Sequence, residues 1–114
     1  MANTIESRKN KRYPSIAKVK IPKVFTGDAL LKDISVTGCR IECTMRTDVH
    51  EESTYAITIF PEDTAAIDSF NLLVDCKWVH SSGYSCDIGF DIKKSPGKRD
   101  FARYVDYLSW RQKT

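Results

Sequence analysis

After residue 16, apolar and polar residues alternate in short runs, the pattern expected of strands with one buried and one solvent-facing side. Cys39, Ile41 and Cys43, for example, alternate with Arg40 and Glu42. About six such runs are joined by short polar segments, which predicts a mainly β fold, a six-stranded antiparallel barrel that is closed or nearly closed. The predicted strands are 17–21, 29–35, 39–46, 55–59, 70–78 and 84–92.

The segments between these runs predict where the chain turns. Residues 26–28, with the sequence Thr-Gly-Asp, are typical of a turn between the first two strands, and Pro22 predicts an edge or a bend. The polar segment 62–68 predicts a loop or a single helical turn. The alternation in the run 70–78 puts Trp78 in phase with core residues, and it leaves open whether the indole is buried or lies at the barrel edge.

The periodicity changes near the C-terminus, where Phe101, Val105 and Leu108 are spaced as on one face of an α-helix. Pro96 suits the first turn of such a helix. We therefore predict a helix of roughly four turns over about residues 96–111, which covers one side or one mouth of the barrel.

The chain has 114 residues, of which 41% are hydrophobic and 29% are charged, values typical of one globular domain. It contains no apolar run long enough to span a bilayer and no apolar N-terminal stretch of the signal-peptide type. We therefore expect a soluble, cytoplasmic protein that does not insert into membranes. Its four cysteines are expected to be reduced core thiols.

Charge is distributed unequally along the chain. Residues 1–23 contain seven basic residues and one acidic residue, a net charge of +6, and the remainder contains eleven basic and fourteen acidic residues, a net charge of −3. Residues 1–14 also lack apolar periodicity. We therefore predict a flexible basic arm over residues 1–14, a single barrel domain over residues 15–114, and a partner that carries phosphate.

Two short motifs follow one another along the chain. Residues 8–12, RKNKR, have the form RxxxR, and residues 33–38, DISVTG, have the form DxSxxG. This pair resembles the signature of the PilZ family, whose best-known members bind the bacterial second messenger cyclic di-GMP. PilZ domains are about this long and are six-stranded barrels with a C-terminal helix. The stretches 74–78 and 88–92 also resemble two of the family's strands.

The resemblance implies a stand-alone receptor for cyclic di-GMP that relays the signal to a partner protein, with an output of the motility, biofilm or virulence type. It implies that Arg8 and Arg12 bind guanine and phosphate, and that Asp33, Ser35 and Gly38 form the second half of the site. Cyclic di-GMP is the expected ligand, and no cofactor is implied.

The residue types suit this ligand. The planar fork of an arginine matches the O6 and N7 edge of guanine, and it also matches phosphate oxygens. The carboxylate of Asp33 can accept the N1–H and N2–H donors of the opposite edge, and Ser35, about 6.6 Å away on the same strand face, adds a hydroxyl. Gly38 permits a close approach that a side chain would block. Further candidate contacts are Lys9, Lys11, Arg40 and Trp78.

Two other functions stay open on the sequence alone. If the arm is aligned on Arg12-Tyr13-Pro14, the two motif positions fall on Lys11 and Ser15, and the chain is a PilZ-type adaptor that acts by protein contact without ligand. A small nucleic-acid-binding barrel would also use a basic arm, but the strands lack exposed aromatics interleaved with Lys and Arg, which argues against it.

The sequence shows no catalytic set and no usual zinc spacing, so we expect neither an enzyme nor a metal site.

Overall fold

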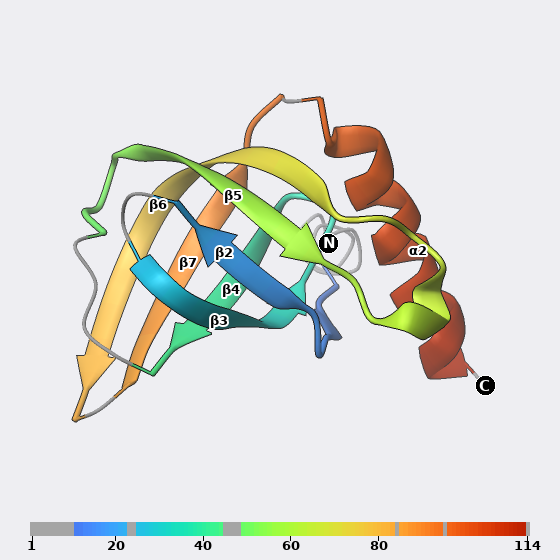
Figure 1. Ribbon diagram of the computed structural model, residues 1–114, viewed down its shortest axis with the longest axis horizontal. Helices are drawn as coiled ribbons and strands as arrows, with labels where there is room; N and C mark the ends of the chain where they lie inside the picture. Colours follow the sequence, from blue (N-terminus) through green and yellow to red (C-terminus); the bar gives the residue numbers. More distant parts are fainter. Residues whose placement is uncertain (1–10, 23–24, 45–48, 84, 95, 114) are drawn as a thin grey trace, which may run out of the picture.

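Six strands of the described chain close into an antiparallel β-barrel in the computed structural model (Figure 1). The structure describes residues 11–22, 25–44, 49–83, 85–94 and 96–113. The strands pair in the order β3-β2-β5-β6-β7-β4, and β4 closes the barrel by pairing with β3. The predicted fold class is confirmed. The barrel strands are β2 (Lys18–Ile21), β3 (Phe25–Ile34), β4 (Gly38–Cys43), β5 (Thr54–Phe60), β6 (Phe70–Ser82) and β7 (Ser85–Ile92).

A short additional strand, β1 (Tyr13–Pro14), pairs with the end of β3. Its register places Pro14 opposite Asp33. The last two residues of the predicted arm therefore belong to the sheet, and residues 1–10 lie outside the described part of the chain. Because proline has no N–H to donate, Pro14 suits this outermost strand.

The connection between β2 and β3 is not the turn that the sequence predicted. Ile21 pairs with Phe25, so the reversal of the chain comes before Phe25, and residues 26–28 lie within β3. The prediction of a turn at Thr-Gly-Asp was wrong because Pro22 ends β2 earlier. Proline has no N–H for the strand ladder, and its fixed φ angle suits a turn.

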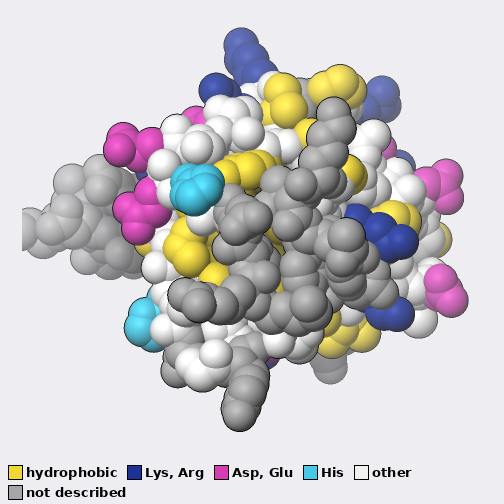
Figure 2. Space-filling view, turned by 60° about the vertical axis from the view of Figure 1, so that its left-hand side comes forward, with side chains coloured by type: hydrophobic (Ala, Val, Ile, Leu, Met, Phe, Trp, Pro, Cys, Tyr) yellow, Lys and Arg dark blue, Asp and Glu magenta, His cyan; other side chains and the backbone are white. Residues whose placement is uncertain are grey.

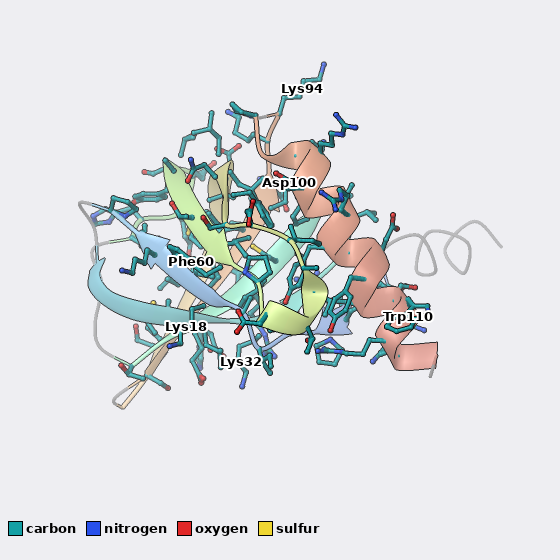
Figure 3. The ribbon with its side chains drawn as sticks, turned by 45° about the vertical axis from the view of Figure 1, so that its right-hand side comes forward. Lys18, Lys32, Phe60, Lys94, Asp100 and Trp110 are labelled. Carbon is teal, nitrogen blue, oxygen red and sulfur yellow. The ribbon has the colours of Figure 1, made fainter. Side chains whose placement is uncertain are left out.

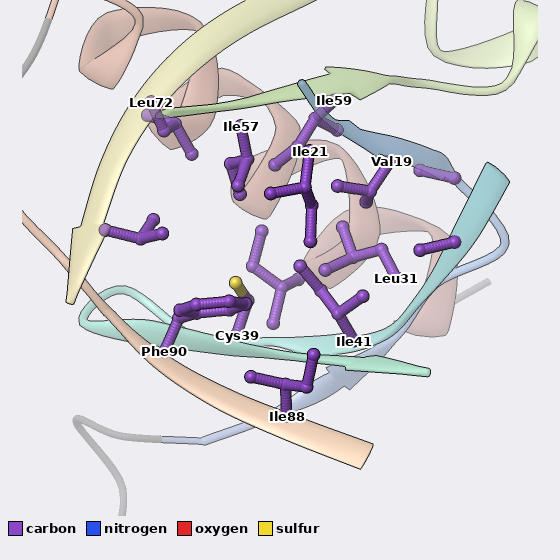
Figure 4. Close-up of a cluster of buried hydrophobic side chains, with 14 of the residues drawn as sticks. Val19, Ile21, Leu31, Cys39, Ile41, Ile57, Ile59, Leu72, Ile88 and Phe90 are labelled. Atoms are coloured by element: carbon purple, nitrogen blue, oxygen red, sulfur yellow. The ribbon is translucent and has the colours of Figure 1, made fainter. Parts of the chain in front are cut away.

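Aliphatic, aromatic and cysteine side chains fill the inside of the barrel and point inward from all of its strands (Figure 4). Burial alternates along the strands, as in β2, where Val19 and Ile21 are buried and Lys18 and Lys20 are exposed. Each fully buried aliphatic or aromatic side chain contributes about 1.5–3 kcal/mol relative to its exposed state. This alternation therefore stabilises the barrel and leaves its outer face free for polar groups.

The four cysteines are buried free thiols, as their strand phase predicted. Burial raises the pKa of Cys39 to about 12 and that of Cys43 to about 11, so both thiols are neutral at physiological pH. Within the described ranges, no three His, Cys, Asp or Glu side chains are grouped as a metal ion would require.

The C-terminal helix, α2 (Lys98–Lys113), packs against β1 and β6 and lies beside the 3₁₀ turn η1 (Asp63–Ala65) (Figure 1). For residues 62–68 the sequence predicted a loop or a single helical turn, and the structure has the helical turn η1 there. Helix α2 begins two residues later than predicted, because Pro96 lies in the turn before it. No described helix is long and apolar enough to cross a membrane. The buried side chains of α2 are Phe101, Tyr104, Val105 and Leu108.

Candidate functional site

The carboxylate of Asp33 lies between two arginines from different parts of the chain. Its Oδ1 atom accepts a hydrogen bond from Nε of Arg12 at 2.7 Å, and its Oδ2 atom lies 3.0 Å from Nε of Arg40. The Asp33 side chain is 17% exposed, against 46% for Arg12 and 39% for Arg40. The structure thus brings the second arginine of RxxxR onto the aspartate of DxSxxG, 21 residues further along.

A β-bulge in β3 turns Asp33 toward the outside of the barrel. The register with β4 shifts between Leu31 and Asp33, so Lys32 is an extra residue. Without the bulge, Asp33 would share the inward face with Leu31, because residues two apart on a strand point the same way. The extra residue reverses this phase, so that Leu31 and Ile34 are buried while Asp33 contacts Arg40 at the surface. Bulges often re-aim a side chain in this way beside functional sites.

The same transverse row of the sheet continues to Trp78. Asp33 pairs with Arg40, Arg40 with Gly89, and Gly89 with Trp78, across β3, β4, β7 and β6. A second bulge, between Cys76 and Trp78, turns the indole out of the core phase, and Trp78 is 41% exposed. The ring covers Gly89, where an added Cβ atom would overlap the indole Nε1 and Cε2 atoms. An aromatic side chain therefore lies in the row that contains the Asp33 cluster.

Arg40 is held in the cluster without a directed hydrogen bond. Its Nε atom lies 3.0 Å from Oδ2 of Asp33, yet it is buried and has no hydrogen-bond partner among the described residues. We interpret this contact as an ion pair, because a hydrogen bond weakens steeply when the N–H does not point at its acceptor. An unsatisfied buried donor costs about 1–3 kcal/mol, so this arrangement of Arg40 is less stable than one in which Nε forms a directed hydrogen bond.

An open pocket of about 430 Å³ lies beside the cluster. Its volume falls within the range of about 300–1,000 Å³ that small-molecule sites occupy. One of its cationic side chains, Lys32, points away from the barrel (Figure 3) and lies 3.7 Å from the carboxylate of Glu42. The excess of cations favours an anionic ligand. The pocket is lined by Arg12, Pro14, Ser15, Lys32, Asp33 and Arg40.

Two other parts of the described surface offer less. A groove of about 110 Å³ between Val36 and α2 is lined mainly by apolar atoms, with Phe101 and Val105 among its residues. On the face shown in Figure 2, charged side chains of both signs are spread around the edge and do not gather into one patch. We therefore place the candidate site at the Asp33 cluster.

Ser35 and Gly38 shape the turn after β3. Ser35 is fully buried, and its Oγ atom accepts from the amides of Thr37 and Gly38 at 3.3 and 3.2 Å. The two-residue spacing had predicted that Ser35 shares the outer face with Asp33, and this was wrong, because β3 ends at Ile34 and Ser35 lies in the turn that follows. Gly38 permits close packing, since a Cβ atom would lie 2.6 Å from the carbonyl oxygen of Phe90.

The structure describes only the last two residues of the RxxxR motif, Lys11 and Arg12. Arg8 and Lys9 lie outside the described residues, and their contacts with a ligand stay predictions. Lys11 is exposed, and its Nζ atom lies 5.6 Å from the ring centre of Tyr13. Lys11 therefore contributes its charge at the solvent side of β1.

The alternative alignment of the arm, on Lys11 and Ser15, fits the geometry less well. Ser15 is 7% exposed, and its hydroxyl lies 2.7 Å from the hydroxyl of Tyr104 in the interior. That alignment would put one of the two motif positions on a serine whose hydroxyl already faces Tyr104. The alignment on Arg12 instead puts a guanidinium on Asp33.

No model of a known protein family matches this chain, and a comparison with curated proteins gives no match. A functional assignment therefore depends on the residues of the site and on the motif resemblance.

Sequence reasoning ranked Arg40 only as a further contact, although it is the second cation on Asp33. The sequence could have indicated this contact in two ways. A reversal of the chain between residues 35 and 38 brings Asp33 opposite Arg40, and Arg40 lies in the polar phase of its strand. The bulge at Lys32 gave no comparable signal.

Proposed function

We propose that this chain is a PilZ-type receptor for cyclic di-GMP, which binds on the outer face of the barrel at Asp33 and relays the signal to a partner protein. The observation that carries the proposal is the cluster in which one carboxylate holds guanidinium groups from two segments, Arg12 and Arg40. The order and spacing of the two motifs give a second, independent support.

Asp33 and Arg12 both keep binding capacity for a ligand. A carboxylate offers about four lone-pair sites, and each oxygen of Asp33 faces one arginine Nε atom. Asp33 can therefore still accept the N1–H and N2–H donors of one guanine. Arg12 contacts Asp33 through Nε, and its terminal nitrogens have no bond to another described residue. They can bind a phosphate or the O6 and N7 edge of the second guanine.

Arg40 and Trp78 extend the site along the sheet. Arg40, whose side chain is 39% exposed, can bind a phosphate oxygen through its guanidinium group. A guanine ring on the exposed indole of Trp78 would contribute about 1–3 kcal/mol of stacking. Lys9 and Lys11 add charge without a planar fork, so their contribution is an attraction that salt weakens.

Titration calorimetry of the full chain with cyclic di-GMP, and separately with single-stranded DNA, tests this function. We expect saturable binding of cyclic di-GMP and no binding of DNA at physiological salt. Binding of DNA alone, with strong salt dependence, would instead support the nucleic-acid-binding barrel. If neither ligand binds, the receptor proposal fails and the ligand-free adaptor becomes the better account.

A further inference from the structure

A buried chain of hydrogen bonds joins the residues that follow Arg12 to helix α2. The Ser15 hydroxyl lies 2.7 Å from the Tyr104 hydroxyl, and the Ala17 amide donates to Ser15 Oγ at 3.0 Å. Tyr104 in turn donates to Oε1 of Glu62 at 2.6 Å. Ser15 and Tyr104 are both buried, so water does not compete for the bond between them.

The carboxylate of Glu62, at the end of this chain, sets the direction of each hydrogen bond. An ionised carboxylate only accepts, so the Tyr104 hydroxyl donates to Glu62 and the Ser15 hydroxyl must donate to Tyr104. Burial and the bond to Glu62 both raise the pKa of Tyr104, which keeps its proton in place. The chain therefore runs from the Ala17 amide to a charged acceptor, and bonds in such a chain polarise and strengthen one another.

Arg111 closes the connection from the end of α2. Its Nη1 atom donates to Oε2 of Glu62 at 2.6 Å, and its Nη2 atom donates to the carbonyl oxygen of Pro14 at 3.2 Å. The side chain of Glu62 is 10% exposed. One planar guanidinium thus bridges a nearly buried carboxylate and the backbone of β1, which a single ammonium group matches less well.

The clamped segment lies directly beside the candidate site. Pro14 is two residues after Arg12 and pairs with Asp33, and the Ser15 amide donates to the carbonyl oxygen of Lys32 at 3.0 Å. Any shift of β1 relative to α2 would therefore move the start of the Arg12 side chain relative to Asp33.

We infer that Arg111 and Tyr104 are positioning residues for the ligand site, which hold β1 in the register that places Arg12 on Asp33. The inference rests on the proposed function, since it names the part of the fold that regulates that site. Because coupling between two sites is reciprocal, a ligand on Arg12 also changes how firmly α2 holds β1. The end of α2 is then the place where binding is communicated.

Amide hydrogen exchange in the ligand-free protein tests the clamp. In Arg111→Ala, the Ser15 and Ala17 amides are expected to exchange about five- to thirty-fold faster, while amides between β5 and β6 are unchanged. Arg103→Ala is the matched control, since Arg103 is on the same helix and contacts only the exposed Asp100 among the described residues. Arg111→Lys keeps the positive charge and serves as the milder variant in case Arg111→Ala unfolds. In it, the Ser15 and Ala17 amides should exchange faster than in wild type but more slowly than in Arg111→Ala. Equal exchange in Arg111→Ala and Arg103→Ala would overturn the inference.

A double-mutant cycle on the affinity for cyclic di-GMP tests the coupling. Arg111→Ala and Arg12→Lys should each lower affinity, and together they should lower it less than the product of their separate effects. If wild type binds and the two effects multiply, the coupling is absent while the proposed function stands. If wild type does not bind, the proposed function fails, and the exchange comparison still decides the clamp.

Discussion

The Nε atom of Arg12 donates a 2.7 Å hydrogen bond to Oδ1 of Asp33, and this contact joins two sequence motifs that lie 21 residues apart. The backbone makes the contact possible, because Pro14 lies opposite Asp33 in the pairing of β1 with β3. The short strand β1 therefore holds Arg12 of the arm beside the carboxylate of Asp33.

Asp33→Ala should abolish binding of cyclic di-GMP and leave the barrel folded. The carboxylate is the proposed acceptor for guanine, whereas partly exposed ion pairs contribute only about 0–1 kcal/mol to stability. Calorimetry measures the first effect and urea unfolding the second. Asp75→Ala, which removes a carboxylate 3.7 Å from Lys93 on another part of the sheet, should bind like wild type. Normal binding by Asp33→Ala would remove Asp33 from the site.

Arg8→Lys and Arg12→Lys should each weaken binding by about 1–3 kcal/mol, because lysine keeps the charge but loses the planar fork. Arg103→Lys, on the exposed face of α2, is the control and should leave the affinity unchanged. Unchanged affinity in both arm variants would mean that the arm acts only as an electrostatic tail.

Trp78→Ala should lose a stacking contribution of about 1–3 kcal/mol. Gly89→Ala should also weaken binding, because its new methyl group would displace the indole. In Trp110→Phe, which removes the exposed tryptophan near the end of α2 (Figure 3), Trp78 is the remaining tryptophan, and its fluorescence should change on addition of cyclic di-GMP. An unchanged emission spectrum at saturating ligand would argue against stacking.

The free energy of unfolding should fall as the pH rises above about 9. Burial raises the pKa of Cys39 from 9.0 to about 12, so above the lower value the unfolded state loses a proton that the folded state keeps. The contribution of this thiol is fully present below pH 9.0 and is lost progressively toward its folded pKa. Urea unfolding under reducing conditions measures the decline, which should be shallower in Cys39→Ala. Equal slopes in the two proteins would contradict the assignment.

Simple periodicity was enough to predict the barrel and its C-terminal helix. The alternation of Val19 and Ile21 with lysines, and the helical spacing of Phe101 and Leu108, place the core residues correctly. The turn before β3 was misplaced, because Pro22 ended its strand before the Thr-Gly-Asp sequence was reached.

The candidate site was predicted less completely, because two bulges decide its geometry. A single extra residue reverses the face of every residue that follows, and no local residue type at Lys32 or Lys77 announces it. The bulges turn Asp33 and Trp78 to the outer face of the sheet, while Ser35 is buried in the turn. The connection of Ser15 to Tyr104 spans 89 residues and has no sequence signature.

Amide hydrogen exchange across residues 1–17, with and without cyclic di-GMP, tests the central claim most directly. Before Tyr13 the arm has few apolar groups of its own, so we expect ligand phosphates and guanine edges to supply the interactions that order it. We predict slower exchange in this segment when ligand is present, an effect that Asp33→Ala abolishes, and little change in β5 and β6. Equal exchange with and without saturating ligand would contradict binding by the arm and Asp33.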